Sequence, residues 1–179
     1  MPPSDAPVQQ MRRPTLSSSC ARAATAEEAR FRLRYPRATQ ASRIVALDQE
    51  AAPIVCRLAG REWSGDARFL TYQARVGAEG NGLPVDAALR TCDGSETRLS
   101  SELDDAEIVV MVATADDAVE AASLIGDACA ERRIMTTGLV LAEWGALDAT
   151  VSSLRPNAMV MVVSMDEDEL VGILTALRV

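Results

Sequence analysis

The sequence predicts an α/β protein: a three-layer, Rossmann-like domain with a mainly parallel sheet of about five strands and helices on both faces. Two observations support this fold class. Short, continuously apolar runs rich in Val and Ile recur along the chain, and helical patterns separate them. The clearest example is the run Ile108–Ala113, which a helical pattern follows up to Arg132. Strands of this kind are buried on both faces, and right-handed crossovers place helices over them.

The other elements follow the same alternation. Apolar runs predict strands at 44–47, 68–73, 107–113, 134–141 and 158–163. Helical patterns predict helices at 48–58, 100–105, 147–155 and 166–177, in addition to the helix that follows the central strand and ends at Arg132. Between 74 and 106, the glycines at 77, 80 and 82 and Pro84 interrupt every long pattern, so only the short helix is expected there.

The chain is expected to divide into a flexible basic arm, residues 1–42, and a Rossmann-like domain, residues 43–179. The arm contains five prolines and a net charge of +4, whereas the rest carries −12. A short helix at 25–33 is one option within the arm. An unstructured tail, a segment that docks on an acidic surface, a transit peptide and a later start of translation all remain open.

Two residue types are missing. The chain has no histidine, and all 18 basic residues are arginine. This excludes Ser-His-Asp and Cys-His catalysis, a Walker lysine, a Schiff-base lysine and imidazole metal ligands. Enzymatic activity is therefore not expected, although carboxylate or cysteine chemistry is still open. Lysine-free, arginine-rich usage suggests a high-GC bacterial source.

Charge and hydropathy limit the partners and the location. A net charge of −8 argues against nucleic acid as a partner, because phosphate contacts dominate that affinity. No apolar run reaches the ~18 residues of a membrane span, so no membrane association is expected. Four cysteines (20, 56, 92 and 129) show no C-x-x-C spacing. Cys56 and Cys129 are expected as free, buried side chains on apolar helix faces, which fits a reducing cytoplasm.

Candidate site residues are those at the carboxyl ends of the strands, where parallel sheets bind ligands. They are Asp48, Arg75, Thr114, Asp116, Asp117, Glu143, Trp144 and Asp166. Their acids suit two roles. They can cap the helices that follow, or they can converge into an anionic edge that holds a hard cation such as Mg²⁺ or receives an arginine-rich partner.

A phosphate cradle is not expected at this edge. Backbone amides can approach a phosphate closely when glycine occupies the first strand-to-helix turn. The turn at 46–53 has no glycine and contains two acids, and the turn at 114–119 has no glycine either. Like charges about 4 Å apart cost on the order of 4 kcal/mol near a protein surface. No nucleotide cofactor is therefore predicted.

Residues 103–179 resemble the nucleotide-binding half of the tubulin-like bacterial cell-division GTPases (the FtsZ type). The similarity lies in the segments 105–113 and 133–141, which match the strands that flank the family's glycine-rich loop, and in Leu154–Pro156 followed by 159–163. Here that loop corresponds to 114–119 and lacks glycine. The resemblance thus implies a domain that has lost nucleotide hydrolysis and kept a self-association surface.

These observations favour a non-catalytic protein-interaction or self-association module without a cofactor. The alternative is a small-molecule or metal-binding domain with its pocket at the carboxyl edge, where Arg75, Asp116 and Trp144 could line it.

Overall fold

The computed structural model describes residues 40–63, 65–76, 86–142 and 147–179. These residues belong to one compact unit, Thr39–Val179. The strands are β1 (Ala41–Ala46), β2 (Asp66–Val76), β3 (Asp86–Thr91), β4 (Glu96–Arg98), β5 (Ile108–Ala113), β6 (Met135–Leu141) and β7 (Val160–Ser164). The helices are α2 (Ala51–Ala59), α3 (Leu99–Leu103), α4 (Val119–Arg132), α5 (Asp148–Asn157) and α6 (Glu167–Ala176). The α/β class is confirmed.

The sheet has seven strands in the order β4-β3-β2-β1-β5-β6-β7. The five predicted strands are its parallel part. The expectation of a mainly parallel sheet of about five strands is wrong: the sheet is mixed and has seven strands, because β3 pairs antiparallel with β2 and β4 pairs antiparallel with β3. Strand β2 pairs with β1 up to Thr71 and with β3 from Leu70 onward, and the register of the β2–β3 pair shifts between Tyr72 and Ala74.

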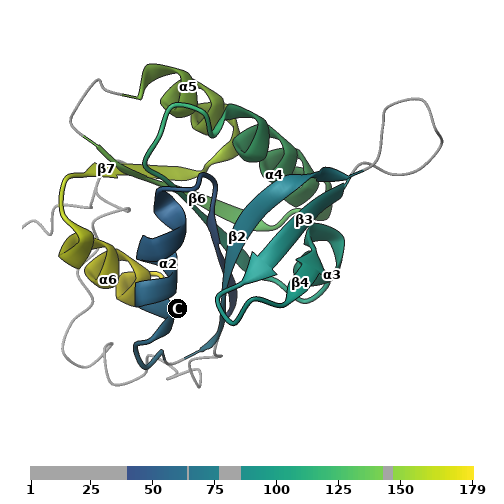
Figure 1. Ribbon diagram of the computed structural model, residues 1–179, viewed down its shortest axis with the longest axis horizontal. Coiled ribbons are helices and arrows are strands. Elements are labelled where there is room, and N and C mark those ends of the chain that lie inside the picture. The colour runs from purple at the N-terminus through teal and green to yellow at the C-terminus, as the bar shows by residue number, and fades with distance from the viewer. Residues whose placement is uncertain (1–39, 64, 77–85, 143–146) are drawn as a thin grey trace, which may run out of the picture. The chain divides into compact units, whose positions relative to one another are not determined.

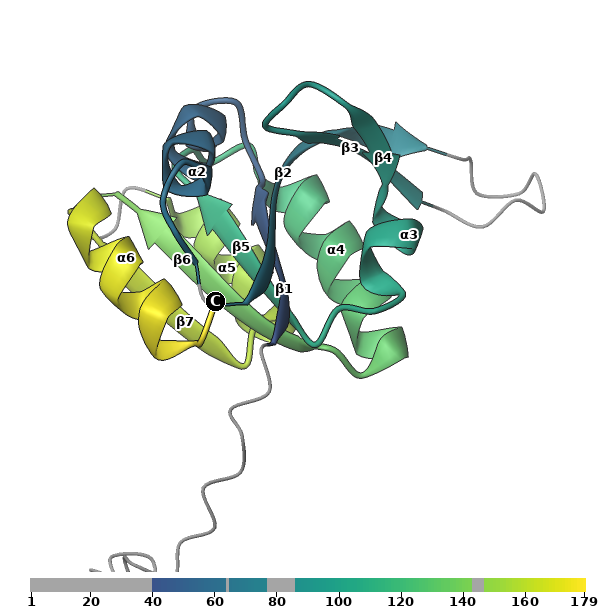
Figure 2. The same cartoon turned by 90° about the horizontal axis from the view of Figure 1, so that it is seen from below.

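Helices cover both faces of the sheet (Figures 1 and 2). On β1 and β5, side chains alternate between the two layers, as the period of two in a strand requires. Val45 and Met111 pack in the cluster that includes residues of α4 and α5. Ile44 and Val110 pack in the cluster that includes residues of α2 and α6. The two apolar layers explain why these strands read as uninterrupted apolar runs.

A buried arginine ties the antiparallel strands to the parallel part. Arg43 of β1 is 1% exposed and donates from Nε to the Glu102 carbonyl (2.9 Å) and from Nη2 to Asp105 Oδ1 (2.6 Å). Glu102 Oε1 accepts from Thr97 of β4, while Oε2 lies 3.4 Å from Arg43 Nε and 2.9 Å from Arg68 Nη1. Oε2 thus makes ion-pair contacts without the geometry of a hydrogen bond. The network joins β1, β2, β4 and α3.

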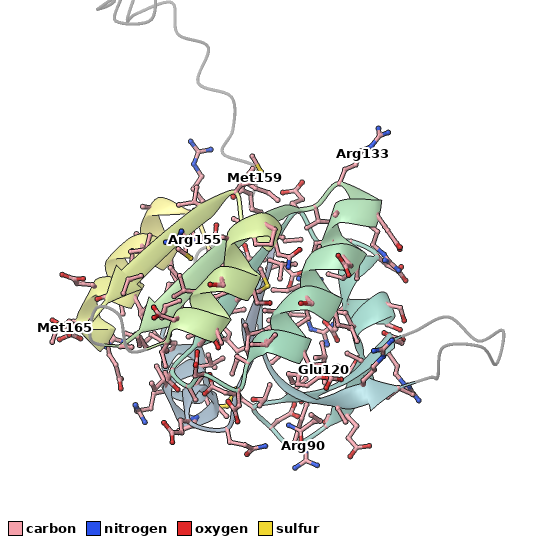
Figure 3. The ribbon with its side chains drawn as sticks, turned by 90° about the horizontal axis from the view of Figure 1, so that it is seen from above. Arg90, Glu120, Arg133, Arg155, Met159 and Met165 are labelled. Carbon is pink, nitrogen blue, oxygen red and sulfur yellow. A yellow bond between two sulfur atoms is a disulfide. The ribbon has the colours of Figure 1, made fainter. Side chains whose placement is uncertain are left out.

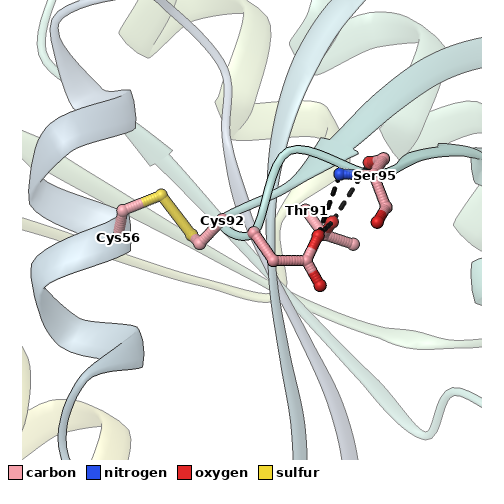
Figure 4. Close-up of a disulfide and its surroundings, with 5 residues drawn as sticks. Cys56, Thr91, Cys92 and Ser95 are labelled. Carbon is pink, nitrogen blue, oxygen red and sulfur yellow. Dashed lines mark hydrogen bonds between the residues drawn. A yellow bond between two sulfur atoms is a disulfide. The ribbon is translucent and has the colours of Figure 1, made fainter.

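The interpretation of Cys56 as a free, buried side chain is wrong. Cys56 of α2 forms a disulfide with Cys92, which lies in the turn after β3, with the Cα atoms 5.4 Å apart (Figure 4). The sequence could not show the pairing because β3 was not predicted. Cys129 is free and buried, as expected. Disulfides persist in oxidising compartments, so the cysteines no longer support the prediction of a reducing cytoplasm. The cytoplasmic location stays a prediction.

The turn that carries Cys92 is held by its own side chains (Figure 4). Thr91 Oγ1 donates to Asp93 Oδ1, and the same oxygen accepts from the Ser95 amide at 2.8 Å. The bond from Thr91, followed by those from Ser95, lowers the pKa of Asp93 to about 2. Gly94 has φ +94°, a conformation that glycine adopts without steric cost.

None of the helices that the structure describes is long and apolar enough to cross a membrane.

Candidate functional site

The topological switch point of the sheet lies between β1 and β5. The crossover through α2 leads from β1 to β2 on one side, and the crossover through α4 leads from β5 to β6 on the other. In a doubly wound sheet the loops after these two strands diverge and leave a crevice at the carboxyl edge, where ligands bind. Here those loops begin with Leu47 and Thr114.

The carboxylate of Asp48 bridges the two loops. Its Oδ1 accepts from the Ala51 amide and from Thr114 Oγ1, both at 2.7 Å. Its Oδ2 accepts from the amides of Thr114 at 2.7 Å and Ala115 at 3.2 Å. The residue is only 6% exposed. Four donors therefore surround one buried carboxylate at the centre of the switch point.

This arrangement is the reverse of a phosphate cradle. In such a cradle, backbone amides at the start of a helix donate to the oxygens of a ligand. The amides of Ala51, Thr114 and Ala115 instead donate to the protein's own carboxylate. Hydrogen bonds to an ionised acceptor are the strong ones, about twice as strong as neutral bonds. The structure thus brings Asp48 and Thr114 together, and their hydrogen bonds occupy the amides that a phosphate would need.

Asp116 caps a distant helix. Its Oδ1 accepts from the amide of Thr150 in the first turn of α5 at 2.9 Å, and Thr150 Oγ1 donates to the Ala115 carbonyl at 2.9 Å. Thr150 is fully buried. Helix α4, which Asp116 precedes in sequence, begins after Ala118 without a side-chain cap. Asp116 therefore fastens α5 to the loop after β5.

The other described acids of the edge have separate surroundings. Asp117 is exposed. Asp166 caps α6 by accepting from the Asp168 amide at 2.9 Å, as the sequence suggests. Beside it, Glu167 pairs with Arg57 of α2 at 2.5 Å. Among the described residues no group of three or more acids or cysteines is placed to hold a metal ion.

Three predicted site residues are not among those described at the switch point. Glu143 and Trp144 fall outside the described residues. Arg75 lies within β2, which continues to Val76, rather than after the strand. It lines a cavity of about 500 Å³ between the β2–β3 pair, α3 and α4, together with Asp86 and Glu120. The switch point and this cavity are different places in the fold.

Ionisable side chains around this cavity have shifted pKa values. Burial, followed by the Glu120 carboxylate that accepts from Tyr72 Oη at 3.2 Å, raises the pKa of Tyr72 to about 12. Burial opposes ionisation of Asp86, but hydrogen bonds from Ser100 Oγ and from the amides of Ala87 and Ser100 outweigh it and lower the pKa. Asp86 holds the start of α3 in place.

A second, smaller pocket of about 260 Å³ lies at the carboxyl edge itself. It is mostly apolar and is lined by Ile54, Thr114, Leu141, Ala142, Met165 and Glu167. Of these, only Thr114 was predicted as a site residue. Apart from Glu167, the others are apolar, and in the sequence an apolar side chain at a strand end or on a helix face is indistinguishable from a core residue.

Large apolar side chains are exposed along the last strand of the sheet. Met159 and Met165, which flank β7, are 75% and 76% exposed, and Val160 is 51% exposed. Figure 3 shows the two methionines at opposite ends of β7. This surface was not predicted, because a continuously apolar run such as 158–163 indicates a strand buried on both faces. The run itself carries no signal of an edge position, since strand order depends on the direction of each crossover.

Comparison of the chain with protein-family models, with curated proteins and with solved structures gave no match.

Proposed function

We propose that the protein is a non-catalytic protein-interaction or self-association module that does not hydrolyse nucleotides. The observation that carries the proposal is the bonding of the Asp48 carboxylate at the switch point. The place where a doubly wound domain ordinarily grips a ligand is filled by a side chain of the protein itself.

An incoming phosphate would have to displace Asp48 from four donors and then lie beside it. Two like charges about 4 Å apart repel by on the order of 4 kcal/mol at an effective dielectric constant of 20. The displaced carboxylate would also lose its hydrogen bonds, each worth about 1.5–3 kcal/mol for an ionised acceptor. Both terms oppose a nucleotide at this position.

The apolar side chains at β7 support the interaction part of the proposal. Met159, Val160 and Met165 are each at least half exposed, and they flank or begin an edge strand. Exposed edges are templates for pairing with another chain, and large apolar side chains there add to the free energy of association. The proposed resemblance to the FtsZ-type GTPases points the same way, since it implies a domain that self-associates without its phosphate loop.

Nucleotide titration tests the proposal directly. The thermal unfolding of the full chain is expected to be unchanged by GTP, ATP or NAD in the presence of Mg²⁺, with no phosphate released. A ligand that binds the folded state raises stability by about 2.7 kcal/mol at 100 times its Kd, so binding would be visible. A rise in melting temperature with any of the three would contradict the proposal.

A matched pair of variants tests the role given to Asp48. Asp48→Ala frees the amides of Thr114 and Ala115, so sulfate is expected to raise the melting temperature of this variant. Asp117→Ala removes an exposed acid from the same loop and is expected to respond to sulfate as the unmodified chain does. Equal responses of the two variants would show that the freed amides are not an anion site.

The alternative function is a small-molecule or metal site at the carboxyl edge, and the 260 Å³ pocket beside Thr114 favours it. Its apolar lining suits an apolar ligand fragment rather than a phosphate. A thermal-shift screen with metabolites and divalent cations separates the two functions, because the interaction module requires neither.

A further inference from the structure

We propose that the partner of β7 is a second copy of this chain, and that the two β7 strands pair in antiparallel about a twofold axis. The sheet then continues across the dimer. This inference rests on the proposed function and names the partner and the surface.

Among the described residues, no strand pairs with the outer side of β7, so its backbone offers a row of hydrogen-bonding groups to a partner. Ser164 accepts from the Ala142 amide, so its carbonyl faces β6. Successive residues of a strand direct their backbone groups to opposite sides, and therefore Met161 and Val163 direct theirs away from β6. In the part of the chain that the structure describes, β7 is the last strand of the sheet on this side. A strand of five residues is long enough for a short antiparallel ladder.

The side chains of β7 lack the features that protect natural edges. Short length, charged side chains, proline and bulges commonly prevent edge-to-edge pairing. At the opposite edge, β4 has only three residues, and a charged residue stands at each of its ends, Glu96 and Arg98. By contrast, β7 reads Val-Met-Val-Val-Ser, without a charge or a proline. Met161 and Val163 are half-buried against one apolar layer and Val162 against the other, so an added strand would extend both layers.

Charge selects the orientation and the partner. Arg155, in the last turn of α5, precedes the amino end of β7 and lies toward Met159 in Figure 3. The carboxyl end leads directly into Asp166, Glu167, Asp168 and Glu169, of which Arg57 and Arg61 pair with two. Antiparallel pairing brings the basic end of each copy to the acidic end of the other. Parallel pairing would bring like charges together.

Such an interface is isologous, since each copy contributes the same surface. The apolar strand is compatible with itself, and the oppositely charged ends make its two halves complementary. A second copy therefore satisfies the backbone, the apolar side chains and the charges at once.

Sedimentation velocity of the full chain over a range of concentrations tests the pairing. A reversible monomer–dimer equilibrium is expected. Val160→Lys places a charge on the exposed edge and is expected to weaken the dimer at least about tenfold. Val119→Lys is the matched control, because Val119 is also exposed (39%) but lies at the start of α4. It should leave the equilibrium unchanged, and circular dichroism confirms that both variants are folded.

A charge exchange tests the antiparallel orientation. Arg155→Glu and Asp168→Arg, each alone, are expected to weaken the dimer about tenfold by placing like charges together. The double variant Arg155→Glu with Asp168→Arg is expected to restore it, since the attraction returns with opposite sign. The Asp168 side chain is 86% exposed, so the exchange perturbs no core contact.

Three results would overturn the inference: a chain that stays monomeric at all concentrations, a dimer that Val160→Lys leaves intact, or a double variant no tighter than the single ones. A monomer would leave the proposed interaction with another protein standing. Nucleotide binding would overturn the proposed function whether or not two copies pair.

Discussion

Asp48 and Glu102 carry buried carboxylates, and each carboxylate contacts segments that are distant in the sequence. Asp48 accepts mainly from backbone amides, whereas Glu102 lies between two guanidinium groups. A buried ion pair adds little net stability when compared with apolar residues of the same shape, but removing one partner leaves the other charge buried and uncompensated. Each residue is therefore sensitive to substitution.

Glu102→Ala is expected to lower the free energy of unfolding by about 3–5 kcal/mol, because the buried guanidinium of Arg43 loses its buried counter-charge and keeps the exposed carboxylates of Asp66 and Asp105. Glu96→Ala is the control. Glu96 is 78% exposed and lies 3.5 Å from Arg90, and an exposed pair contributes about 0–1 kcal/mol. Urea denaturation measures both. Equal losses for the two variants would show that the Arg43 network does not hold β4 and α3 in place.

Tyr72 provides a test at alkaline pH. Its folded pKa, about 12, lies above the unfolded value of 10.0, because burial and then the Glu120 carboxylate oppose the phenolate. The resulting stability is complete below pH 10 and is lost as the pH rises through 12. Phenolate absorbance measures the titration, and Tyr35→Phe leaves Tyr72 as the only tyrosine. Glu120→Gln should lower the midpoint. A midpoint near 10 in the folded chain would contradict this contact.

At the residue scale, the sequence identified which side chains lie at the edge but not what they do there. Asp48, Thr114 and Asp166 follow strands, and this position could be predicted from the apolar runs. The bond between Asp48 and the loop after β5 could not be predicted, because it depends on how closely the fold places Asp48 and Thr114, which are 66 residues apart in the sequence. Asp116 was expected near its own helix and instead caps α5.

The strands of the parallel part could be predicted, because strands buried on both faces appear in the sequence as continuous apolar runs. β5 is buried at every position and was predicted almost to the residue. β4 contains no large apolar residue, and β3 has only Ala87 and Leu89 fully buried, so neither resembles a strand in isolation. They form as strands because β3 pairs with β2 and β4 pairs with β3. The disulfide, which depends on β3, was unpredictable for the same reason.

Two glycines in helices should respond oppositely to the same substitution. A Cβ on Gly126 of α4 would lie 2.4 Å from Asn157 of α5, so Gly126→Ala is expected to cost about 1–3 kcal/mol by forcing the helices apart. A Cβ on Gly172 of α6 would meet nothing within 4 Å, so Gly172→Ala is expected to stabilise by about 0.5–1 kcal/mol. Thermal unfolding measures both. A neutral Gly126→Ala would contradict the close packing of α4 on α5.

Reduction of the disulfide between α2 and the turn after β3 should lower the free energy of unfolding. Cys56 and Cys92 are 36 residues apart, and closing a loop of this size removes about 4 kcal/mol of unfolded-state entropy in the chain-entropy model. A dithiol reductant is therefore expected to lower the urea midpoint. The Cys56→Ser/Cys92→Ser variant should unfold at that lower midpoint and be insensitive to the reductant. A midpoint that the reductant leaves unchanged would show that the bond does not form in solution.

At the scale of the whole molecule, the sheet has two different edges. One edge is the short, charged strand β4, and the other edge is the apolar strand β7. The sequence predicted the parallel centre of the sheet, because burial on both faces leaves continuous apolar runs. It could not show which strand lies at an edge, since strand order depends on the direction of each crossover. The interaction surface was missed for that reason.

The switch point at the centre of the sheet carries the main claim of this account: its amides are already bonded to Asp48. The most direct measurement follows the ¹H–¹⁵N signals of Ala51, Thr114 and Ala115 while GTP and Mg²⁺ are added to the full chain. We expect all three signals to stay where they are up to millimolar nucleotide. Saturable shifts of these three amides would mean that a phosphate replaces the Asp48 carboxylate, and would contradict the account.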